Sequence, residues 1–254
     1  MPDVLVIGDD FTGVNATAAL YAGAGLTAVT AASIDSARRL EADVLLLSTQ
    51  TRELADRAAA TRVLRAVTEL GDFADLVVKR VDPTLRGNVG PETAAMLSVM
   101  RRLRPAARVV GLVVPASPAL GRTTRDGVHY LDGEPVAETW AGHDPFSPVR
   151  ASAVAEIMAL RAGPGITEVR LGEVRAGIDR LAFTLAHAAR RADLIVADAV
   201  THADLRALAR AATRAAVDSP PGDRLSWIAV DSGPFGAELA AEFATLRNAA
   251  QRAG

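Results

Sequence analysis

Short apolar segments alternate with longer helical patterns along most of the chain. The first segment, Val4–Ile7, is apolar and mostly β-branched, as expected of a buried strand in a parallel sheet. Seven further segments share this character and are predicted to be strands: Leu26–Thr30, Val44–Ser48, Leu76–Lys79, Val109–Val114, Glu168–Leu171, Leu194–Ala197 and Trp227–Val230. Strands that alternate with helices predict an α/β fold with a layered, mostly parallel, Rossmann-like sheet.

The segments between these strands carry helical periodicity. Met96, Val99, Met100 and Leu103 follow the i, i+3, i+4, i+7 spacing of one helix face. Further helices are predicted at Ala16–Ala22, Arg52–Leu70, Ile178–Arg191 and Ala203–Val217, with a last one ending at Arg252. We therefore expect an α/β domain over residues 1–230. Residues 231–254 are expected to form a linker and a C-terminal helix that lead to a domain outside this chain.

The segment Pro115–Val149 breaks the alternation and is rich in glycine and proline. Within it, Val128–Leu131 and Pro135–Thr139 flank the turn sequence Asp132-Gly133-Glu134, which predicts an inserted β-hairpin. A loop of this length in a compact domain is either functional or disordered. The paired strand signals favour an ordered, functional insert.

Composition narrows the classes of function. The chain has 254 residues, half of them hydrophobic, and a net charge of −2 with both signs interspersed, so we expect neither a nucleic-acid nor a membrane partner. The absence of cysteine excludes disulfides, zinc–thiolate sites and thiol nucleophiles. No apolar run approaches the roughly 18–20 residues of a membrane span, and the N-terminus lacks a signal peptide's basic start. We expect a cytoplasmic protein.

The loop after the first strand carries two adjacent carboxylates, Asp9 and Asp10, followed by Thr12, Gly13 and Asn15. A strand, a polar loop and a helix in this order place a ligand at the carboxyl edge of an open α/β sheet. A helix cap alone needs one carboxylate or hydroxyl, so the pair favours a functional site over a purely structural cap.

A second polar loop, Lys79–Gly90, follows the strand that begins at Leu76. Pro91 is expected as the first helical residue, so the loop ends at a helix N-terminus, which favours an anion. Arg86 suits bidentate binding of a carboxylate or phosphate. The alternative is a surface loop with a weak Asp82–Arg86 ion pair.

Three other residues of this loop are candidates for the same site. Gly87 permits a close backbone approach, and Asn88 can donate to a hydroxyl or carbonyl. Lys79 is the single lysine among 28 basic residues. Either its position requires a compact ammonium group or its survival is chance.

The insert supplies a third group of candidates. Arg122, Thr123 and Thr124 are suited to an acid's carboxylate and hydroxyls, and Asp126-Gly127 to a turn. His143-Asp144 is either an acid–base pair or a satisfied histidine beside a turn-capping aspartate.

Standard nucleotide signatures are missing. Gly8 and Gly13 have phosphate-loop spacing, but Val14-Asn15 occupies the place of the required Lys-Ser/Thr. No G-x-G-x-x-G follows any predicted strand, and adjacent aspartates do not match the D-x-D of haloacid-dehalogenase-type phosphatases. No nucleotide or metal site is therefore predicted in this chain.

Together, the three polar stretches resemble the four-carbon acid sugar kinase family. Ile7–Asn15 is similar to its motif I-x-D-D-x-T-G-A-N, and Lys79–Gly90 to K-x-D-S-T-L-R-G-N-x-G. The third motif, P-A-x-P-x-x-G-R-T-T-x-D-G-x-H-Y, resembles Pro115–Tyr130. Pro83 stands where the pattern has serine, and the chain ends where the family's nucleotide-binding domain begins.

This resemblance implies a sugar-acid-binding N-terminal domain of an enzyme that phosphorylates threonate-, erythronate- or 2-oxotetronate-like acids with ATP and Mg²⁺. Asp10 would be the general base, and Lys79 would neutralise the transferred phosphoryl group or orient Asp10. The expected substrate-binding residues are Asp9, Thr12, Asn15, Asp82, Arg86, Gly87, Asn88, Arg122, Thr123 and His143.

The expected partners are the sugar acid, a separate nucleotide-binding domain or subunit, and a second copy of the chain in a homo-oligomer. A stand-alone, non-catalytic acid-binding or regulatory module is the alternative that Pro83 and the missing domain suggest. A lyase or isomerase that uses Asp9, Asp10 and His143 is a third hypothesis.

Overall fold

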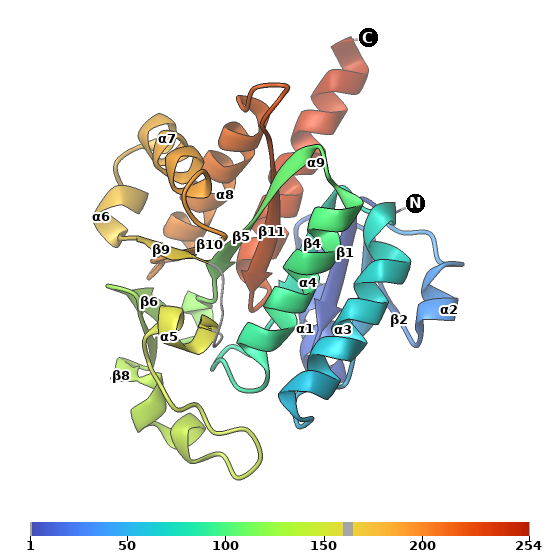
Figure 1. Cartoon of the computed structure of the whole chain (residues 1–254). Coiled ribbons are helices and arrows are strands. Elements are labelled where there is room, and N and C mark those ends of the chain that lie inside the picture. Colours follow the sequence, from blue (N-terminus) through green and yellow to red (C-terminus); the bar gives the residue numbers. More distant parts are fainter. Residues whose placement is uncertain (1, 160–164, 254) are drawn as a thin grey trace.

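An eight-stranded parallel sheet forms the centre of the protein in the computed structural model, which describes residues 2–159 and 165–253 (Figure 1). The strands are ordered β2-β3-β1-β4-β11-β5-β10-β9. Their bounds are β1 Val4–Gly8, β2 Ala28–Ala31, β3 Val44–Ser48, β4 Leu76–Arg80, β5 Ala107–Val114, β9 Ile166–Val169, β10 Leu194–Ala197 and β11 Arg224–Asp231. The predicted α/β fold with a layered parallel sheet is confirmed.

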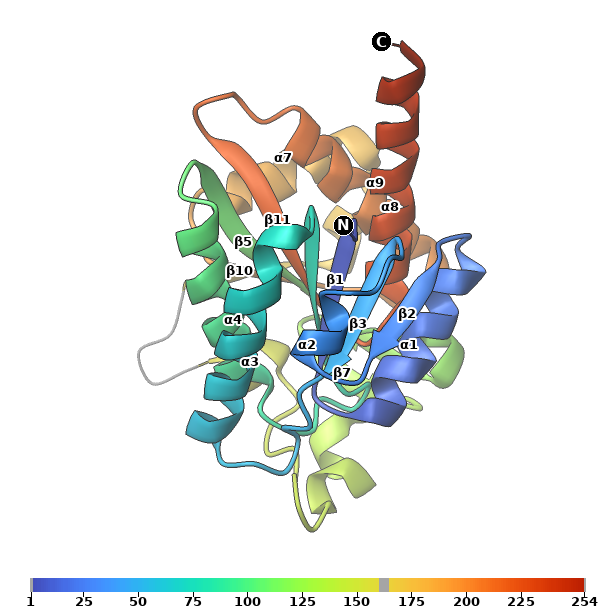
Figure 2. The ribbon, with the colours of Figure 1, turned by 90° about the vertical axis from the view of Figure 1, so that its right-hand side faces the viewer.

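Helices cover both faces of this sheet (Figures 1 and 2). One face carries α1 Phe11–Gly23, α6 Leu171–Val174, α7 Ile178–Ala189, α8 His202–Val217 and α9 Pro234–Ala253. The other carries α2 Ile34–Ala37, α3 Asp56–Leu70, α4 Val89–Leu103 and α5 Val154–Met158. Val4 and Val6 pack into the first layer and Leu5 and Ile7 into the second, which explains why the strands are continuously apolar. None of the described helices has the length and apolarity to cross a bilayer.

Two helices begin at places that matter for function. The first, α1, starts at Phe11 and not at the predicted Ala16, because Asp10 caps it by accepting a 2.7 Å hydrogen bond from the backbone amide three residues on. The other, α3, starts at Asp56, so Arg52 lies in the preceding loop and not in the predicted helix. Both shifts place charged side chains in loops at the carboxyl edge of the sheet.

Smaller differences affect two other boundaries. The helix α4 begins at Val89, which makes Pro91 its third residue and not its first. The strand β9 ends at Val169, two residues before the predicted Leu171, because Leu171 begins α6.

The predicted insert is present as an antiparallel sheet of β6 Arg122–Arg125, β7 Val128–Leu131 and β8 Glu134–Pro135. Asp132 and Gly133 form its turn, both with positive φ (52° and 90°). The predicted second strand of the hairpin, Pro135–Thr139, is wrong beyond its first residue, because the chain enters a 3₁₀ turn at Val136. The insert lies beyond the carboxyl ends of the parallel strands, at the bottom of Figure 1.

The last helix, α9, belongs to the core at its beginning and leaves it at its end. Phe235 and Leu239 are fully buried in the layer that α1 and α8 share. The far half of α9 extends past the sheet at the end opposite the insert (Figures 1 and 2).

A buried ion pair joins the sheet to α4. Lys79 of β4 and Glu92 of α4 are each 1% exposed and lie 2.7 Å apart, Nζ to Oε2. Lys79 also donates a 2.8 Å hydrogen bond to the backbone carbonyl of Arg80. The ammonium group therefore fixes the end of β4 against the first turn of α4.

Replacing Lys79 by methionine should leave the Glu92 carboxylate buried without a counterion. We expect a loss of about 3–5 kcal/mol in the free energy of unfolding, measured by urea denaturation. The matched double variant, Lys79→Met with Glu92→Leu, should recover most of that loss. A single variant as stable as the wild type would contradict the buried pair.

Candidate functional site

Three loops meet at the carboxyl end of β1. In the sheet β1 lies between β3 and β4, and the chain reverses its winding direction there, which is where ligands bind in open α/β folds. Backbone hydrogen bonds hold two of the loops together, since the amides of Thr49 and Thr51 donate to the carbonyls of Gly8 and Asp9, each at 2.9 Å. Side chains from the three loops therefore face one another.

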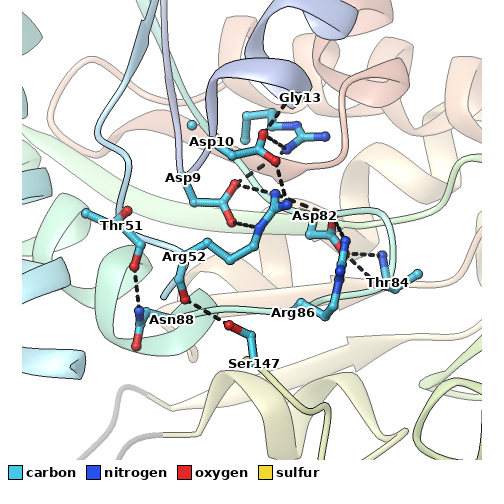
Figure 3. Close-up of polar contacts among 12 residues, drawn as sticks. Asp9, Asp10, Gly13, Thr51, Arg52, Asp82, Thr84, Arg86, Asn88 and Ser147 are labelled. Atoms are coloured by element: carbon cyan, nitrogen blue, oxygen red, sulfur yellow. Dashed lines mark hydrogen bonds and ion pairs between the residues drawn. The ribbon is translucent and has the colours of Figure 1, made fainter. Parts of the chain in front are cut away.

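The centre of this site is Arg52, which follows β3. Its Nε and Nη2 donate to Asp9 at 2.8 and 3.1 Å, and its Nη1 lies 2.5 Å from Oδ2 of Asp10 (Figure 3). Its Nη2 also lies 3.4 Å from Oδ1 of Asp82. Burial alone would lower the pKa of the Arg52 guanidinium, but its bond to Asp9 and the charges of Asp9, Asp82 and Asp10 raise it above its usual range. Arg52 therefore stays charged among three carboxylates.

Arg52 was not among the predicted site residues, because the sequence pattern predicted a helix from Arg52 to Leu70. One signal was available, since the pair Thr51-Arg52 follows a predicted strand, as the loops of Asp9 and Asp82 do. The carboxyl ends of neighbouring parallel strands share an edge, so a lone arginine there was a candidate.

Arg80, the last residue of β4, also contacts the carboxylates of Asp9 and Asp10. Its Nη1 lies 3.4 Å from Oδ1 of Asp9 and 3.3 Å from Oδ1 of Asp10. The residue is 4% exposed and lies against the first turn of α1, where a Cβ on Gly13 would come within 1.9 Å of Nη1. Gly13 is thus needed to admit the Arg80 guanidinium.

The loop after β4 presents Asp82 and Arg86 to each other. Nε and Nη2 of Arg86 donate to the two oxygens of Asp82 at 3.0 and 3.1 Å, and Thr84 donates to Oδ2 through its amide and its hydroxyl. Leu85 holds this tight turn at a φ of 62°, in the left-handed region that costs a leucine energy. Burial tends to raise the pKa of Asp82, but Arg86, Arg52 and Thr84 together lower it to about 2.

The insert reaches both arginines. Nη1 of Arg86 donates to Asp144 at 2.9 Å, and its guanidinium carbon lies 5.0 Å from the ring centre of Trp140. The Ser147 hydroxyl donates to the Arg52 carbonyl at 3.1 Å. Of the two alternatives for His143-Asp144, the structure favours the turn-capping aspartate, because Oδ1 of Asp144 accepts from the amides of Phe146 and Ser147 and Oδ2 pairs with Arg86. His143 is exposed, and its Nδ1 bonds the Thr139 carbonyl at 3.1 Å.

A buried histidine fastens the hairpin to the β4 loop. Nε2 of His129 donates to the Pro83 carbonyl at 2.9 Å, and Nδ1 lies 3.0 Å from the Thr124 hydroxyl. Burial lowers the pKa of His129 to about 4, so the ring is neutral near pH 7. Because the loop uses the carbonyl of Pro83, a proline can stand in place of serine without losing this contact.

Arg122 lies on the same face of the hairpin as Thr124 and His129. Its charge contributes to the lowered pKa of His129. Among the residues that the structure describes, its hydrogen-bond partner is the carbonyl of Leu120, and its buried Nε has none. Unlike Arg52, Arg80 and Arg86, it has no carboxylate partner among those residues.

The remaining predicted residues differ in position. Gly87 adjoins the cluster, since a Cβ there would lie 3.3 Å from Oδ2 of Asp9. The Asn88 amide donates to the carbonyls of Thr51 and Leu54 at 2.9 Å, so it supports the Arg52 loop and does not face a ligand.

Four further predicted site residues also lie outside the cluster. Thr12 and Asn15 are exposed on α1, and Thr123 is half-buried opposite Tyr130. Lys79 is enclosed with Glu92, which favours a structural position over the predicted one on a phosphoryl group.

The cluster combines four carboxylates (Asp9, Asp10, Asp82 and Asp144) with three guanidinium groups (Arg52, Arg80 and Arg86). Such an array offers acceptors for hydroxyl groups and donors for a carboxylate. Within residues 2–159 and 165–253, no three Asp, Glu, His or Cys side chains are arranged to hold a metal ion. The carboxylates here are bound by arginine instead.

Two cavities lie away from this edge. One cavity, of about 300 Å³, opens between α7 and α8. The other, a groove of about 770 Å³, runs along the amino ends of the strands beside α9. Neither contains the clustered charges, so we place the candidate site at the carboxyl edge of β1.

The chain belongs to the family of sugar-binding N-terminal domains, whose family model matches residues 4–239. It is 39% identical over 214 residues to a D-threonate kinase of Salmonella typhimurium, covering 82% of this chain and 48% of that protein. A D-erythronate kinase of Heliobacterium modesticaldum is 35% identical over 250 residues, covering 95% and 53%. The chain thus spans about half the length of the curated relatives it matches.

A solved structure has the same fold. A domain of unknown function from Bordetella bronchiseptica, a domain-swapped dimer with bound citrate, is 30% identical with a TM-score of 0.77. The match covers 96% of this chain and 56% of that one. The resemblance noted in the sequence to four-carbon acid sugar kinases is therefore confirmed at the level of the family.

The lowered pKa of Asp82 predicts how stability depends on pH. Since the folded-state pKa of about 2 lies below the ordinary value of 3.8, ionised Asp82 stabilises the fold above about pH 4, and this contribution is lost as the pH falls through 2. Asp82→Asn should cost about 2 kcal/mol in the free energy of unfolding at pH 6, and the difference from the wild type should shrink by pH 3.

Urea denaturation at both pH values measures this difference. Asp126→Asn is the matched control, because Asp126 is exposed in a turn whose positive φ asparagine tolerates. An Asp82→Asn difference that is independent of pH would contradict the ion-pair network.

Proposed function

We propose that this chain is the sugar-acid-binding part of an ATP-dependent four-carbon acid sugar kinase. The observation that carries the proposal is the arginine–carboxylate cluster at the carboxyl edge of β1, in a chain of the sugar-binding N-terminal family. The names of the relatives, D-threonate and D-erythronate kinase, support a hydroxylated four-carbon acid as the substrate. A 3-oxo-tetronate kinase of Methylobacterium radiotolerans, 29% identical to the chain, points to the same class of substrate.

The chain's own residues bind and orient the acid. Arg122 would receive the substrate carboxylate, since it has no carboxylate partner among the described residues and its buried Nε has no hydrogen-bond partner there. The carboxylates of Asp9 and Asp10 would accept hydrogen bonds from the hydroxyls. Arg86, held by Asp82 and Asp144, forms a wall of the site that Trp140 covers.

Asp10 would accept the proton of the hydroxyl that receives the phosphoryl group. Its side chain is 26% exposed, whereas those of Asp9 and Asp82 are 4% and 6% exposed. Asp10 is therefore the carboxylate that a bound substrate reaches most readily, and proton transfer at this position suits phosphoryl transfer.

A second candidate is a non-catalytic acid-binding module. Both oxygens of Asp10 already have partners, because Oδ1 accepts from Gly13 and lies beside Arg80, while Oδ2 pairs with Arg52. An oxygen of Asp10 would have to give up one of these partners before it could take a proton from a substrate hydroxyl. This arrangement fits binding as well as it fits catalysis, so the two functions need separate tests.

ATP and Mg²⁺ belong to the proposal through the resemblance to four-carbon acid sugar kinases noted in the sequence. The carboxylates of the cluster are engaged by arginines, and no three Asp, Glu, His or Cys side chains in the described residues are arranged as a metal site. We assign ATP and Mg²⁺ to a nucleotide-binding part, either a further domain or a separate subunit. A cytoplasmic location agrees with a supply of ATP. A homo-oligomer agrees with the domain-swapped dimer of the Bordetella structure.

Isothermal titration calorimetry tests acid binding. The chain should bind D-threonate or D-erythronate but neither the neutral four-carbon polyol threitol nor ATP. Arg122→Ala should weaken acid binding by about tenfold or more, the value of a lost charge-assisted bond. Arg125→Ala, an exposed position on the same strand, is the matched control. Tight ATP binding without acid binding would overturn the proposal.

The Asp10→Asn variant distinguishes a catalytic kinase part from a non-catalytic acid-binding module. Asparagine keeps the cap of α1 but cannot take a proton, so acid binding should persist. In a protein that includes the nucleotide-binding part, kcat for phosphorylation of D-threonate should fall by about 10²–10⁴. Unchanged turnover would remove Asp10 from the base position.

A further inference from the structure

The sequence Asp231-Ser232-Gly233-Pro234-Phe235-Gly236 joins β11 to α9 and has no part in the site described so far. Asp231 is fully buried, and its Oδ2 accepts 2.8 Å hydrogen bonds from the amides of Gly233 and Gly236, so it caps α9. The Ser232 hydroxyl donates to the Pro115 carbonyl at 2.9 Å, where the insert begins. This junction therefore touches both the last helix and the insert.

The same junction reaches the candidate site through Arg80. Asp231 and Arg80 are register partners on the adjacent parallel strands β11 and β4. Parallel partners point to the same face, here the layer that contains Val78 and Ala229. Oδ1 of Asp231 and Nε of Arg80 are both buried and without a hydrogen-bond partner among the described residues.

Tyr21 of α1 is buried beside Asp231 and Gly236. Its hydroxyl is also unpartnered within the described part of the chain, and a Cβ on Gly236 would lie 2.6 Å from it and 3.0 Å from Oδ1 of Asp231. Burial and, to a smaller extent, the charge of Asp231 raise the pKa of Tyr21, so the phenol stays neutral. Arg80, the register partner of Asp231, acts on it through its charge. No acidic residue lies in the first turn of α9.

Arg80 thus interacts with the carboxylates of Asp9 and Asp10 and also with the carboxylate of Asp231. On one side its Nη1 lies 3.4 Å from Asp9 and 3.3 Å from Asp10, and on the other its charge acts on Asp231. A buried arginine has little water to screen it, so a charge on Asp231 changes the field at Asp9 and Asp10.

We propose that Asp231 is a positioning residue for the candidate site, acting through Arg80 on Asp9 and Asp10 and so coupling the acid-binding cluster to the first turn of α9. The inference rests on the proposed function of this cluster. When Asp231 is neutral, no negative charge there offsets the positive charge of Arg80. The net charge around Asp9 and Asp10 is then less negative. An anionic sugar acid then binds more tightly.

The sign of the pH dependence follows from burial. Burial raises the pKa of Asp231 to about 6, although the amides of Gly236 and Gly233 and the charge of Arg80 act to lower it. As the pH rises through 6, Asp231 gains its charge while a hydroxy acid with a pKa below about 4 keeps its own. Affinity for D-threonate should therefore fall by about fivefold between pH 5 and pH 7.

Calorimetry with D-threonate at pH 5 and pH 7 tests the coupling. Asp231→Asn should bind with the wild-type affinity of pH 5 at both pH values, and in an Arg80→Met background the same substitution should have no effect on binding. Asp198→Asn is the matched control, because Asp198 is also buried at the carboxyl end of a strand, directly after β10, and accepts hydrogen bonds from the amides of Asp126, Gly127 and Leu171. This variant should keep the wild-type pH dependence.

An Asp231→Asn variant that keeps the full wild-type pH dependence would overturn the inference. If the wild type binds no acid at either pH, the proposed function has failed, and ¹³C NMR of the Asp9 and Asp10 carboxyl groups tests the coupling alone. Their resonances should inflect near pH 6 in the wild type and not in Asp231→Asn. Titrations without that inflection would overturn the coupling.

Discussion

The structure depends on placing arginines between carboxylates that would otherwise repel one another. Asp9, Asp10 and Asp82 come from loops after two neighbouring strands and converge where little water screens them. Bringing such charges together costs several kcal/mol unless cations of matching geometry join them. Arg52 supplies three donor nitrogens to all three carboxylates at once, which a lysine could not do with the same geometry.

The fold followed from apolar periodicity because both faces of a parallel sheet are buried. The segments Val44–Ser48 and Leu194–Ala197 were predicted to the residue. Periodicity does not report caps, so the extension of α1 to Phe11 and the loop position of Arg52 were not predicted. Of the residues predicted for the site, Asp9, Asp10, Asp82 and Arg86 lie together in the cluster. Lys79 is instead buried in an ion pair with Glu92, a contact that periodicity does not reveal, and its chemical role stays a prediction.

Paired and unpaired arginines have different consequences for function. Arg86 is held by two carboxylates and an aromatic ring, so taking it away from them would cost most of what an incoming acid gains. Arg122 has no such commitment among the described residues, and it comes from the insert that also anchors the loops through His129 and Ser147. The insert therefore contributes to the site through His129 and Ser147, and Arg122, the proposed ligand of the substrate carboxylate, comes from the same segment.

Mapping the bound acid on the chain tests the central claim most directly. In an ¹⁵N NMR titration with D-threonate, the account predicts that the amide signals of Asp9, Asp10, Arg52, Asp82 and Arg122 shift together and saturate at one affinity. Shifts confined to the cavity between α7 and α8, or to the groove beside α9, with the carboxyl edge of β1 unchanged, would contradict it.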